Sequence, residues 1–456
     1  MNLPALFPTA ILYIKVVVIQ LVSKSLIPVQ LEVPVIYNLF PRLAGTMPDW
    51  LEHAKHAASM RFNWLFINSI LYPGFSGSLY AVKHHYRINP EFLPANNNDN
   101  GLNLLEQTLH KFQDLGLWPM MDLVINHTAR DCPLVQEHPD WYLHNEHGEV
   151  TSPFAVDPDD PSKVTVWGDL AEINNSGTSD KAELWNYWAE LVKHYLHLGF
   201  KGFRCDAAYK VPAQLWQYLI EQAKEIEPDV VFMAETLGSM ESETLALRGV
   251  GFHYLFNSSK WWDFNQAWCL NQHDEFGKIA ASISFPETHD TTRLAADTCG
   301  NEAIQRQRYA FAAVFSAGLM MPIGYEFGFR KRLNVVTTQP TDWEKPSFDL
   351  TNFIRKINEL KLEHSLFHGE GHLRQVENGD NLLVMERQTE QSPDQTGWIL
   401  VNKNCNASAS VNIEDISGLN EQHSLYRLCR DGNYIPGEPF SNQAIILDPA
   451  EIAVIL

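Results

Sequence analysis

The sequence lacks several patterns that identify common classes of protein. Its six cysteines form no CxxC pair, so neither zinc-ligand spacing nor a dense disulfide framework is visible. There is no glycine-rich phosphate loop, internal repeat, low-complexity tract or block of like charge. These absences argue against a zinc domain, a disulfide-rich module, a P-loop protein and a repeat array. They also make a reducing compartment the default expectation.

Positive charge is scarce as well. The chain has 34 Lys and Arg against 55 Asp and Glu, which gives a formal net charge of −21 at pH 7. Such an excess of acid repels phosphate backbones and anionic lipid surfaces, so we expect neither a nucleic-acid nor a membrane partner. A neutral ligand such as a sugar is compatible with this charge. The sequence does not indicate an oligomeric state.

Long apolar runs are missing too. The segment Ala10–Val22 is apolar except for Lys15 and Gln20, but it is too short to span a membrane comfortably. A signal peptide has a basic start and a small-residue cleavage point, and this segment has neither in convincing form. We therefore expect residues 1–32 to be a loosely ordered leader and the protein to be cytoplasmic, with export as the alternative.

What is present is a chain of 456 residues with 45% hydrophobic residues, enough for a large domain and a smaller one. From residue 33, short apolar runs alternate with longer stretches of helical periodicity, which predicts a (β/α)8 barrel, the TIM-barrel fold of the α/β class. The predicted strands are Val33–Leu39, Trp64–Ile70, Trp118–Ile125, Gly202–Cys205, Val230–Ala234, Phe252–Leu255, Ile283–Pro286 and Leu319–Ile323. The predicted helices include Trp50–Met60, Leu102–Asp114, Ala182–Leu198 and Pro212–Ile226.

Two regions depart from the βα alternation. Residues 128–181 are polar and rich in Pro, Asp and His, which predicts a short insertion within the barrel of residues 33–365. After about residue 365 short strand-like runs replace the helical patterns, so residues 366–456 are expected to form a separate antiparallel β-sandwich domain. Its predicted strands are Leu382–Glu386, Gly397–Val401, Ala409–Ile413, Ser424–Leu428 and Ala444–Leu447.

Acidic residues stand at the ends of four predicted barrel strands, where the active site of this fold lies. They are Asp122, Asp206, Glu235 and Asp290. A single acid at a strand end is more often a helix cap or a loop residue, and a single histidine is more often a satisfied loop residue. Four acid-bearing strand ends in one chain are much harder to explain by such ordinary roles.

Converging carboxylates suit the cleavage of a glycosidic bond, which needs one protonated acid and one ionised acid. Arg204 stands two residues before Asp206 on the same strand face and favours its ionised, nucleophilic form. Glu235 has no adjacent Arg, and the nearby aspartates hold its proton, which suits a general acid/base. Asp290 is the third carboxylate, expected to grip sugar hydroxyls and favour ring distortion.

At these residues the chain resembles glycoside hydrolase family 13, the α-amylase family. The segments that carry the resemblance are Asp122-Leu-Val-Ile-Asn126-His127, Gly202-Phe-Arg204-Cys-Asp206, Glu235 and His289-Asp290, in the family's order. The resemblance implies Asp206 as nucleophile, Glu235 as acid/base and Asp290 as transition-state stabiliser. It covers about residues 33 to 450.

The same resemblance implies further ligands of the sugar. It assigns substrate contacts to Asp122, His127, Arg204 and His289, a stacking platform to Tyr80 and a calcium ligand to Asn126. The sequence departs from the family where many members have Lys-His after the nucleophile, since here the pair is Tyr209-Lys210. Lys210 is therefore our candidate on the acceptor side, whose specificity is left open. No cofactor is expected to be required, with calcium as the one candidate ion.

Three functions are compatible with these residues. The first is hydrolysis of α-1,4-glucosidic bonds in an oligosaccharide or glucan, through a covalent glycosyl-enzyme and with retention. The second is transglycosylation by the same triad, since residues 169–212 and Gly249–Phe252 resemble the family's maltosyltransferases that use maltose 1-phosphate. The third is a catalytically silent barrel that only binds sugar. A barrel with unrelated chemistry is the most distant alternative.

Overall fold

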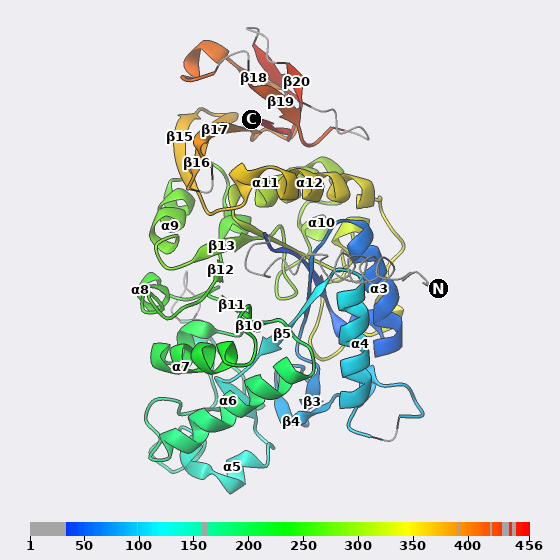
Figure 1. Cartoon of the computed structure of the whole chain (residues 1–456), viewed down its shortest axis with the longest axis vertical. Helices are drawn as coiled ribbons and strands as arrows, with labels where there is room; N and C mark the ends of the chain where they lie inside the picture. The colour runs from blue at the N-terminus through cyan, green and yellow to red at the C-terminus, as the bar shows by residue number, and fades with distance from the viewer. Residues whose placement is uncertain are drawn as a thin grey trace, which may run out of the picture.

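A computed structural model describes the chain at residues 33–97, 99–156, 162–390, 392–419, 422–430, 437–439 and 444–456. The predicted leader at residues 1–32 lies outside the described residues. In Figure 1 the barrel lies at the centre, and an all-β region lies at the top, beyond two of the helices that cover the barrel. No helix of the described ranges is both long and apolar enough to cross a membrane.

Eight parallel strands close into a barrel, which confirms the predicted fold. Around the barrel the order is β1, β14, β13, β12, β11, β10, β5, β2 and back to β1. Their bounds are β1 Val35–Leu39, β2 Trp64–Ile67, β5 Trp118–Leu123, β10 Gly202–Cys205, β11 Val231–Ala234, β12 Tyr254–Phe256, β13 Ala281–Ser284 and β14 Gly318–Pro322. Each overlaps a predicted strand.

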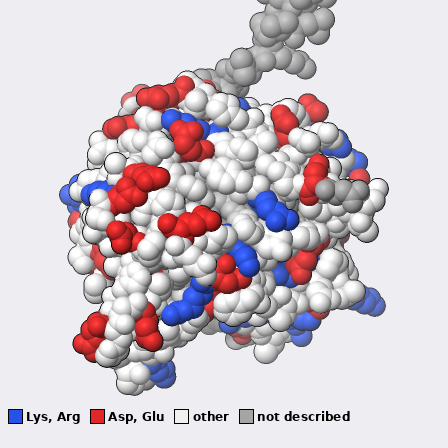
Figure 2. Space-filling view, turned by 90° about the horizontal axis from the view of Figure 1, so that it is seen from below, with Lys and Arg blue, Asp and Glu red and all other residues white. Residues whose placement is uncertain are grey.

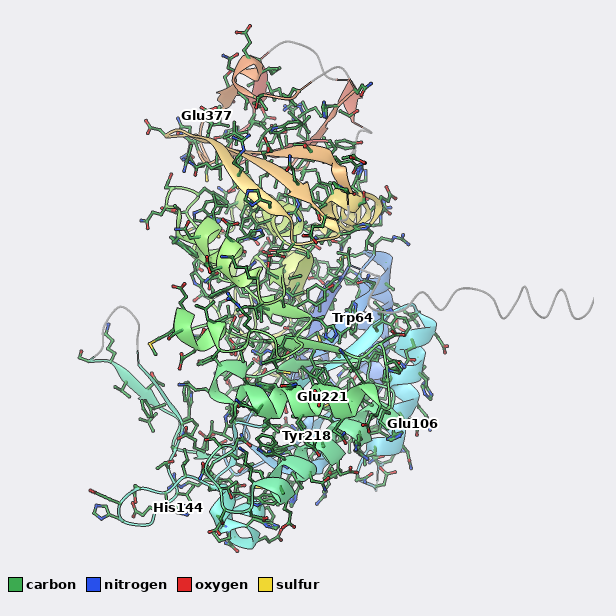
Figure 3. All side chains as sticks on the ribbon, turned by 60° about the vertical axis from the view of Figure 1, so that its left-hand side comes forward. Trp64, Glu106, His144, Tyr218, Glu221 and Glu377 are labelled. Carbon is green, nitrogen blue, oxygen red and sulfur yellow. The ribbon has the colours of Figure 1, made fainter. Side chains whose placement is uncertain are left out.

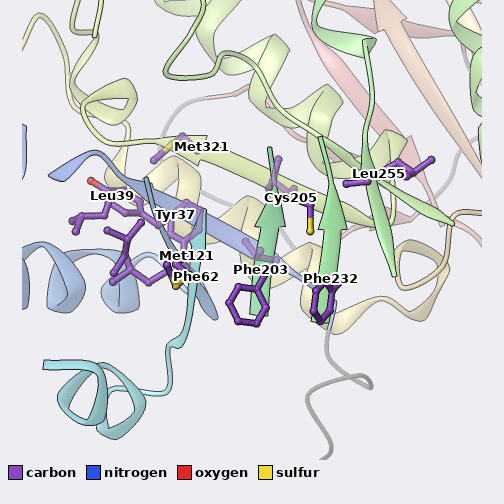
Figure 4. Close-up of a cluster of buried hydrophobic side chains, with 14 of the residues drawn as sticks. Tyr37, Leu39, Phe62, Met121, Phe203, Cys205, Phe232, Leu255 and Met321 are labelled. Atoms are coloured by element: carbon purple, nitrogen blue, oxygen red, sulfur yellow. The ribbon is translucent and has the colours of Figure 1, made fainter. Parts of the chain in front are cut away.

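Alternation along β10 decides which side chains enter the barrel. Phe203 and Cys205 are buried in the outer core between the strands and the helices, beside Phe232 of β11 (Figure 4). Successive strand residues face opposite sides, so Arg204 points inward. Gly202 leaves room for Trp64, since a Cβ at position 202 would lie 2.9 Å from the Trp64 ring and from the Val231 carbonyl.

Helices cover the outside of the barrel. The longer ones are α3 Met47–Ser59, α4 Leu102–Asp114, α6 Lys181–His197, α7 Ala213–Lys224, α9 Trp268–Phe276, α11 Glu302–Phe315 and α12 Thr351–Glu363. In α4 the buried residues Leu105, Thr108, Leu109 and Phe112 recur at helical spacing and face the strands. The four predicted helices are confirmed, with ends that differ by a few residues. Short helices are α2 Pro41–Ala44, α5 Leu134–Glu137, α8 Glu241–Leu245 and α10 Leu294–Asp297.

Small β-hairpins extend the loops that follow two barrel strands. After β2, the strands β3 Leu71–Pro73 and β4 Val82–Ile88 pair antiparallel. After β5, the predicted insertion holds β6 His127–Ala129 paired with β9 Leu170–Glu172, and β7 Phe154–Val156 paired with β8 Val164–Val166. Figure 3 places His144 of this insertion at the opposite end of the molecule from Glu377 of the C-terminal region.

The C-terminal region is an antiparallel β-sandwich, as predicted. Its larger sheet has the order β15, β16, β17, β22, β19, β20, and β18 pairs with β21 in a second sheet. The bounds are β15 His372–Asn378, β16 Leu382–Thr389, β17 Ser392–Asn402, β18 Ala409–Val411, β19 Ser424–Arg427, β20 Glu438–Pro439, β21 Ile445–Leu447 and β22 Ile452–Ile455. Val384 and Leu400 of the larger sheet share one apolar core with Val411 and Leu447 of the smaller one.

One buried side chain, Arg387, joins this sandwich to the barrel, and a second, Lys361, joins two barrel helices beside it. Arg387 of β16 is fully buried and donates to the carbonyls of Phe315, Leu366 and Gly369. Lys361 of α12 is also fully buried, with Nζ 2.8 Å from the carbonyls of both Ala313 and Ser316. The other face of the larger sheet therefore packs on the barrel helices through a polar as well as an apolar contact.

Candidate active site

The four predicted acids meet at one rim of the barrel. Asp122 lies on β5, Asp206 directly follows β10, Glu235 directly follows β11, and Asp290 lies in the loop after β13. Strands β5, β10 and β11 are neighbours and parallel, so their carboxyl ends lie side by side.

Arg204 contacts three of the four acids. Its Nη1 lies 2.7 Å from Oδ1 of Asp122 and 2.7 Å from Oδ1 of Asp206. Its Nη2 lies 3.7 Å from Oε2 of Glu235. The Arg204 side chain is 6% exposed, so water screens these attractions only weakly. The guanidinium thereby offsets much of the repulsion between carboxylates that share a small volume.

Glu235 is held in place by two backbone N–H groups. Ala207 donates to Oε2 at 2.9 Å, and Leu237 donates to Oε1 at 2.6 Å. Burial raises the pKa of Glu235 to about 7, with Asp206 and Asp290 adding to the rise while Arg204 and the Ala207 N–H oppose it. A carboxyl with this pKa is both proton donor and proton acceptor near neutral pH.

Asp290 differs from Glu235 in that its pKa is lowered. Its side chain is 62% exposed, and Oδ2 lies 3.0 Å from Nε2 of His289. Partial loss of water around it acts to raise its pKa, but His289, Arg204 and Arg332 outweigh this effect and lower the pKa to about 2. Two carboxyls of one site therefore have well-separated pKa values, which favours a protonated Glu235 beside an ionised Asp290.

Tyr80 joins the two sides of the site. Its hydroxyl lies 2.5 Å from Oδ2 of Asp122, 2.8 Å from Nε2 of His289 and 3.0 Å from Nδ2 of Asn68. Its ring is parallel to the His289 imidazole, at 4° and with centroids 5.8 Å apart. The hydroxyl fixes the orientation of the ring, which suits a rigid wall of a sugar site.

The remaining predicted ligands differ in their distance from this cluster. His127 lies on β6, is 7% exposed and contacts the Tyr80 carbonyl through Nε2 at 3.2 Å. Burial lowers the pKa of His127. Lys210 is exposed, with Nζ 5.3 Å from the centre of the Tyr209 ring. No contact joins Lys210 to an acid of the cluster in the described residues, so it stays a predicted acceptor-side residue.

Asn126 is the predicted calcium ligand. Oδ1 of Asn126 is buried without a hydrogen-bond partner among the described residues, so one oxygen could face a cation. Calcium takes about six to eight oxygen ligands, usually including carboxylates. The described ranges contain one group of three metal-ligating side chains, His138, Asp180 and Glu183, and it does not include Asn126. Within the described ranges no group of three such side chains lies at Asn126, and calcium there stays a prediction.

Other contributors to the site were not predicted. Ala207 adopts a left-handed conformation, φ 39°, that turns its N–H onto Glu235. Arg332 donates from Nη2 to the Asp290 carbonyl at 2.5 Å. Glu287 and Arg293, each 1% exposed, form a 2.6 Å ion pair below the His289 loop. An Arg six residues after a Glu was the one sequence signal for this pair, and it is a weak one.

The face of the molecule in Figure 2 carries acidic and basic side chains interspersed, without a continuous basic area. Such a surface does not favour a polyanion. Carboxylates, a tyrosine hydroxyl and imidazoles are groups that can form hydrogen bonds with sugar hydroxyls.

Known proteins share both sequence and fold with this chain. Residues 28–154 match the family model "Glycogen debranching enzyme, glucanotransferase domain". An α-1,4-glucan:maltose-1-phosphate maltosyltransferase of Burkholderia pseudomallei is 24% identical over 391 residues, which covers 83% of this chain and 34% of that protein. One of Picrophilus torridus is 27% identical over 49% of this chain and 36% of its own length. The chain thus spans about a third of the length of these relatives.

Solved structures match over nearly the full length. An α-amylase from Lactobacillus plantarum has a TM-score of 0.71 at 19% identity, covering 94% of this chain and all of that one. The α-amylase from Geobacillus thermoleovorans, complexed with acarbose, has a TM-score of 0.70 at 16% identity over 94% of this chain and 98% of that chain. These similarities, together with acids in the family's order on a closed barrel, support the resemblance of the chain to glycoside hydrolase family 13, the α-amylase family.

Proposed function

We propose that this chain is a retaining α-glycosidase of the α-amylase type, which opens α-1,4-glucosidic bonds through a covalent glycosyl-enzyme. The observation that carries the proposal is the contact of one guanidinium, that of Arg204, with Asp122, Asp206 and Glu235. It brings a candidate nucleophile and a candidate acid into one buried cluster. Retaining glycosidases need such a pair at about 5 to 5.5 Å separation.

In the first step Glu235 donates its proton to the leaving glycosidic oxygen; because its pKa is about 7, a substantial fraction of it carries that proton at neutral pH. The Asp206 carboxylate attacks the anomeric carbon, so the C–O bond to the leaving group breaks as the glycosyl ester forms. Arg204 favours the ionised form of Asp206. Asp290 stabilises the positive charge that develops on the sugar ring.

In the second step Glu235, now ionised, takes a proton from the attacking hydroxyl, and the Asp206–glycosyl bond breaks. If that hydroxyl belongs to water, the products are shorter glucans. If it belongs to another sugar, the same residues carry out transfer. The chemistry of the cluster is the same in both cases, and access to the acceptor side decides between them.

Maltosyl transfer is the second candidate, and the relatives favour it specifically. The similar proteins of Burkholderia pseudomallei and Picrophilus torridus are both named as maltosyltransferases that use maltose 1-phosphate. Because this chain spans about a third of their length, the donor and acceptor of those proteins are carried over here only as a proposal.

A single product profile tests both candidates. Wild type and Asp206→Asn would be incubated with maltoheptaose, alone and together with maltose 1-phosphate, and the products separated by length. New reducing ends in maltoheptaose alone support hydrolysis, whereas longer chains and released phosphate in the mixture support transfer. Binding without turnover by the wild type would favour the silent sugar-binding barrel. Turnover undiminished in Asp206→Asn would contradict the assigned nucleophile.

We infer a cytoplasmic location, supported by six cysteines that are all free thiols in the described residues. The partner in this proposal is an α-glucan or maltooligosaccharide. The proposed steps use side chains of the chain alone. Calcium at Asn126 stays a prediction, tested by whether chelation lowers the melting temperature or the activity.

A further inference from the structure

One side chain outside the predicted triad contacts the backbone of the third carboxylate. Arg332 lies in the loop after β14, here called the strand-eight loop and defined as residues Phe329–Val336. Its Nη2 donates to the main-chain carbonyl of Asp290 at 2.5 Å, across 42 residues of sequence. Within the described ranges the Asp290 carbonyl is the one protein group to which this guanidinium donates. The bond therefore couples the strand-eight loop to the loop after β13, here called the strand-seven loop, which contains Asp290.

The strand-eight loop is itself fixed on both sides of Arg332. On one side Arg293 donates from Nε to the Lys331 carbonyl at 3.4 Å, and the Lys331 N–H donates to Glu344 at 2.7 Å. On the other side the Val335 carbonyl accepts from the Leu79 N–H at 3.1 Å, and from Nε of the nearly buried Arg42. Arg332 thus extends from a fixed stretch of backbone, which limits where its guanidinium can lie.

Asp290 has few other restraints. Its carboxylate contacts His289, and its N–H donates to Oγ1 of Thr288 at 3.2 Å. His289 is shared with Tyr80, and the Asp290 side chain is mostly exposed. A catalytic carboxylate has to be held to within about 0.5 Å of its productive position. An exposed loop residue with these contacts needs a further fixed point.

We propose that Arg332 is a positioning residue, whose bond to the Asp290 carbonyl holds the third carboxylate in place beside Asp206 and Glu235. The inference rests on the proposed function, since it assumes that Asp290 acts on the sugar ring. The Arg332 guanidinium also favours the ionised form of Asp290, because both groups lie at the same rim of the site. Removing Arg332 then affects the chemical step more than the capture of the glucan.

The test compares Arg332→Gln and Arg332→Lys with Arg330→Gln. Arg330 is an exposed arginine of the same loop, which donates to the Cys299 carbonyl at 3.4 Å and has no contact with Asp290. Initial rates on maltoheptaose, and on maltoheptaose with maltose 1-phosphate, would be measured from pH 4 to pH 9. Melting temperatures of the three variants and the wild type show whether each protein is folded.

We expect Arg332→Gln to lower kcat by about 10- to 100-fold, as misplacement of a reacting group by about 1 Å does. KM should change by less than about threefold, and the acid limb of the kcat profile should move to higher pH. Arg332→Lys should recover part of kcat, and Arg330→Gln should match the wild type. If kcat of Arg332→Gln equals that of Arg330→Gln, or only KM changes, the positioning role is overturned. An inactive wild type would instead contradict the proposed function.

Discussion

Ala207 donates its N–H to Oε2 of Glu235 at 2.9 Å, from the position directly after Asp206 and with φ of 39°. A non-glycine residue in the left-handed region costs about 1 to 2 kcal/mol. Because Ala207 directly follows Asp206, this turn after β10 fixes the position of Asp206 relative to Glu235 through one hydrogen bond. The separation of the two carboxyls depends on backbone geometry as much as on rotamers.

The raised pKa of Glu235 predicts the pH dependence of activity. The first step needs the protonated acid, so kcat/KM should fall as pH rises through about 7. Replacing Glu235 by Gln should remove this basic limb and lower kcat by about 10²- to 10⁴-fold on substrates with a poor leaving group. The measurement is a pH profile with maltoheptaose. A profile that stays flat to pH 9 would contradict the assignment.

The same pKa predicts a stability effect. A carboxyl whose pKa is raised on folding contributes stability below its unfolded pKa, near 4.5, and that contribution is lost as pH rises through about 7. Glu235→Gln should therefore be more stable than the wild type at pH 8, by about 1 to 3 kcal/mol, and nearly equal to it at pH 4. Urea unfolding at both pH values measures this. A variant that is less stable at pH 8 would show that the amide loses more in hydrogen bonds than burial of the charge costs.

Arg204 should matter for folding as well as for turnover. Replacing it by Met leaves Asp122, whose side chain is fully buried, without its cation. Breaking a buried ion pair costs about 3 to 5 kcal/mol. Burial already raises the pKa of Asp122 and Arg204 lowers it, so the variant's loss should shrink at low pH, where Asp122 becomes protonated. Denaturant unfolding of Arg204→Met and Arg204→Lys at pH 7 and pH 4.5 tests this, and a loss that does not depend on pH would argue against it.

Tyr80→Phe should weaken the site without disturbing the barrel. It removes the hydroxyl between Asp122 and His289 and leaves buried polar atoms without a partner, which costs about 1 to 3 kcal/mol. Activity should fall because His289 loses one of its two fixed contacts. Tyr86→Phe is the matched control, since that ring is 37% exposed and lies outside the site. Equal melting temperatures and rates for the two variants would contradict this role for Tyr80.

The strands and the convergence of the acids could be predicted because their signals are local. Each barrel strand is a short apolar run, and parallel pairing of β5, β10 and β11 brings any acid at their ends together. Alternation along β10 was enough to place Arg204 on the same side as the acids. These inferences need only the period of a strand and the rule that barrel sites lie at one rim.

The rest depended on contacts that sequence periodicity does not encode. Arg332 reaches Asp290 only because the strand-eight loop bends back toward the strand-seven loop. The left-handed conformation of Ala207 has no signal, since alanine rarely adopts it. In the C-terminal region β15 was not predicted, because His372–Asn378 is a mostly polar strand at the edge of its sheet.

Arg387 also couples the unfolding of the sandwich to that of the barrel. Its guanidinium belongs to a strand of the sandwich, yet one of its acceptors, the Phe315 carbonyl, ends a helix of the barrel. Detaching the sandwich alone would expose a seam of apolar residues and break this bond in a dry environment. We therefore expect calorimetry of the protein to record one cooperative transition. Heat or denaturant should then unfold the sandwich and abolish turnover together.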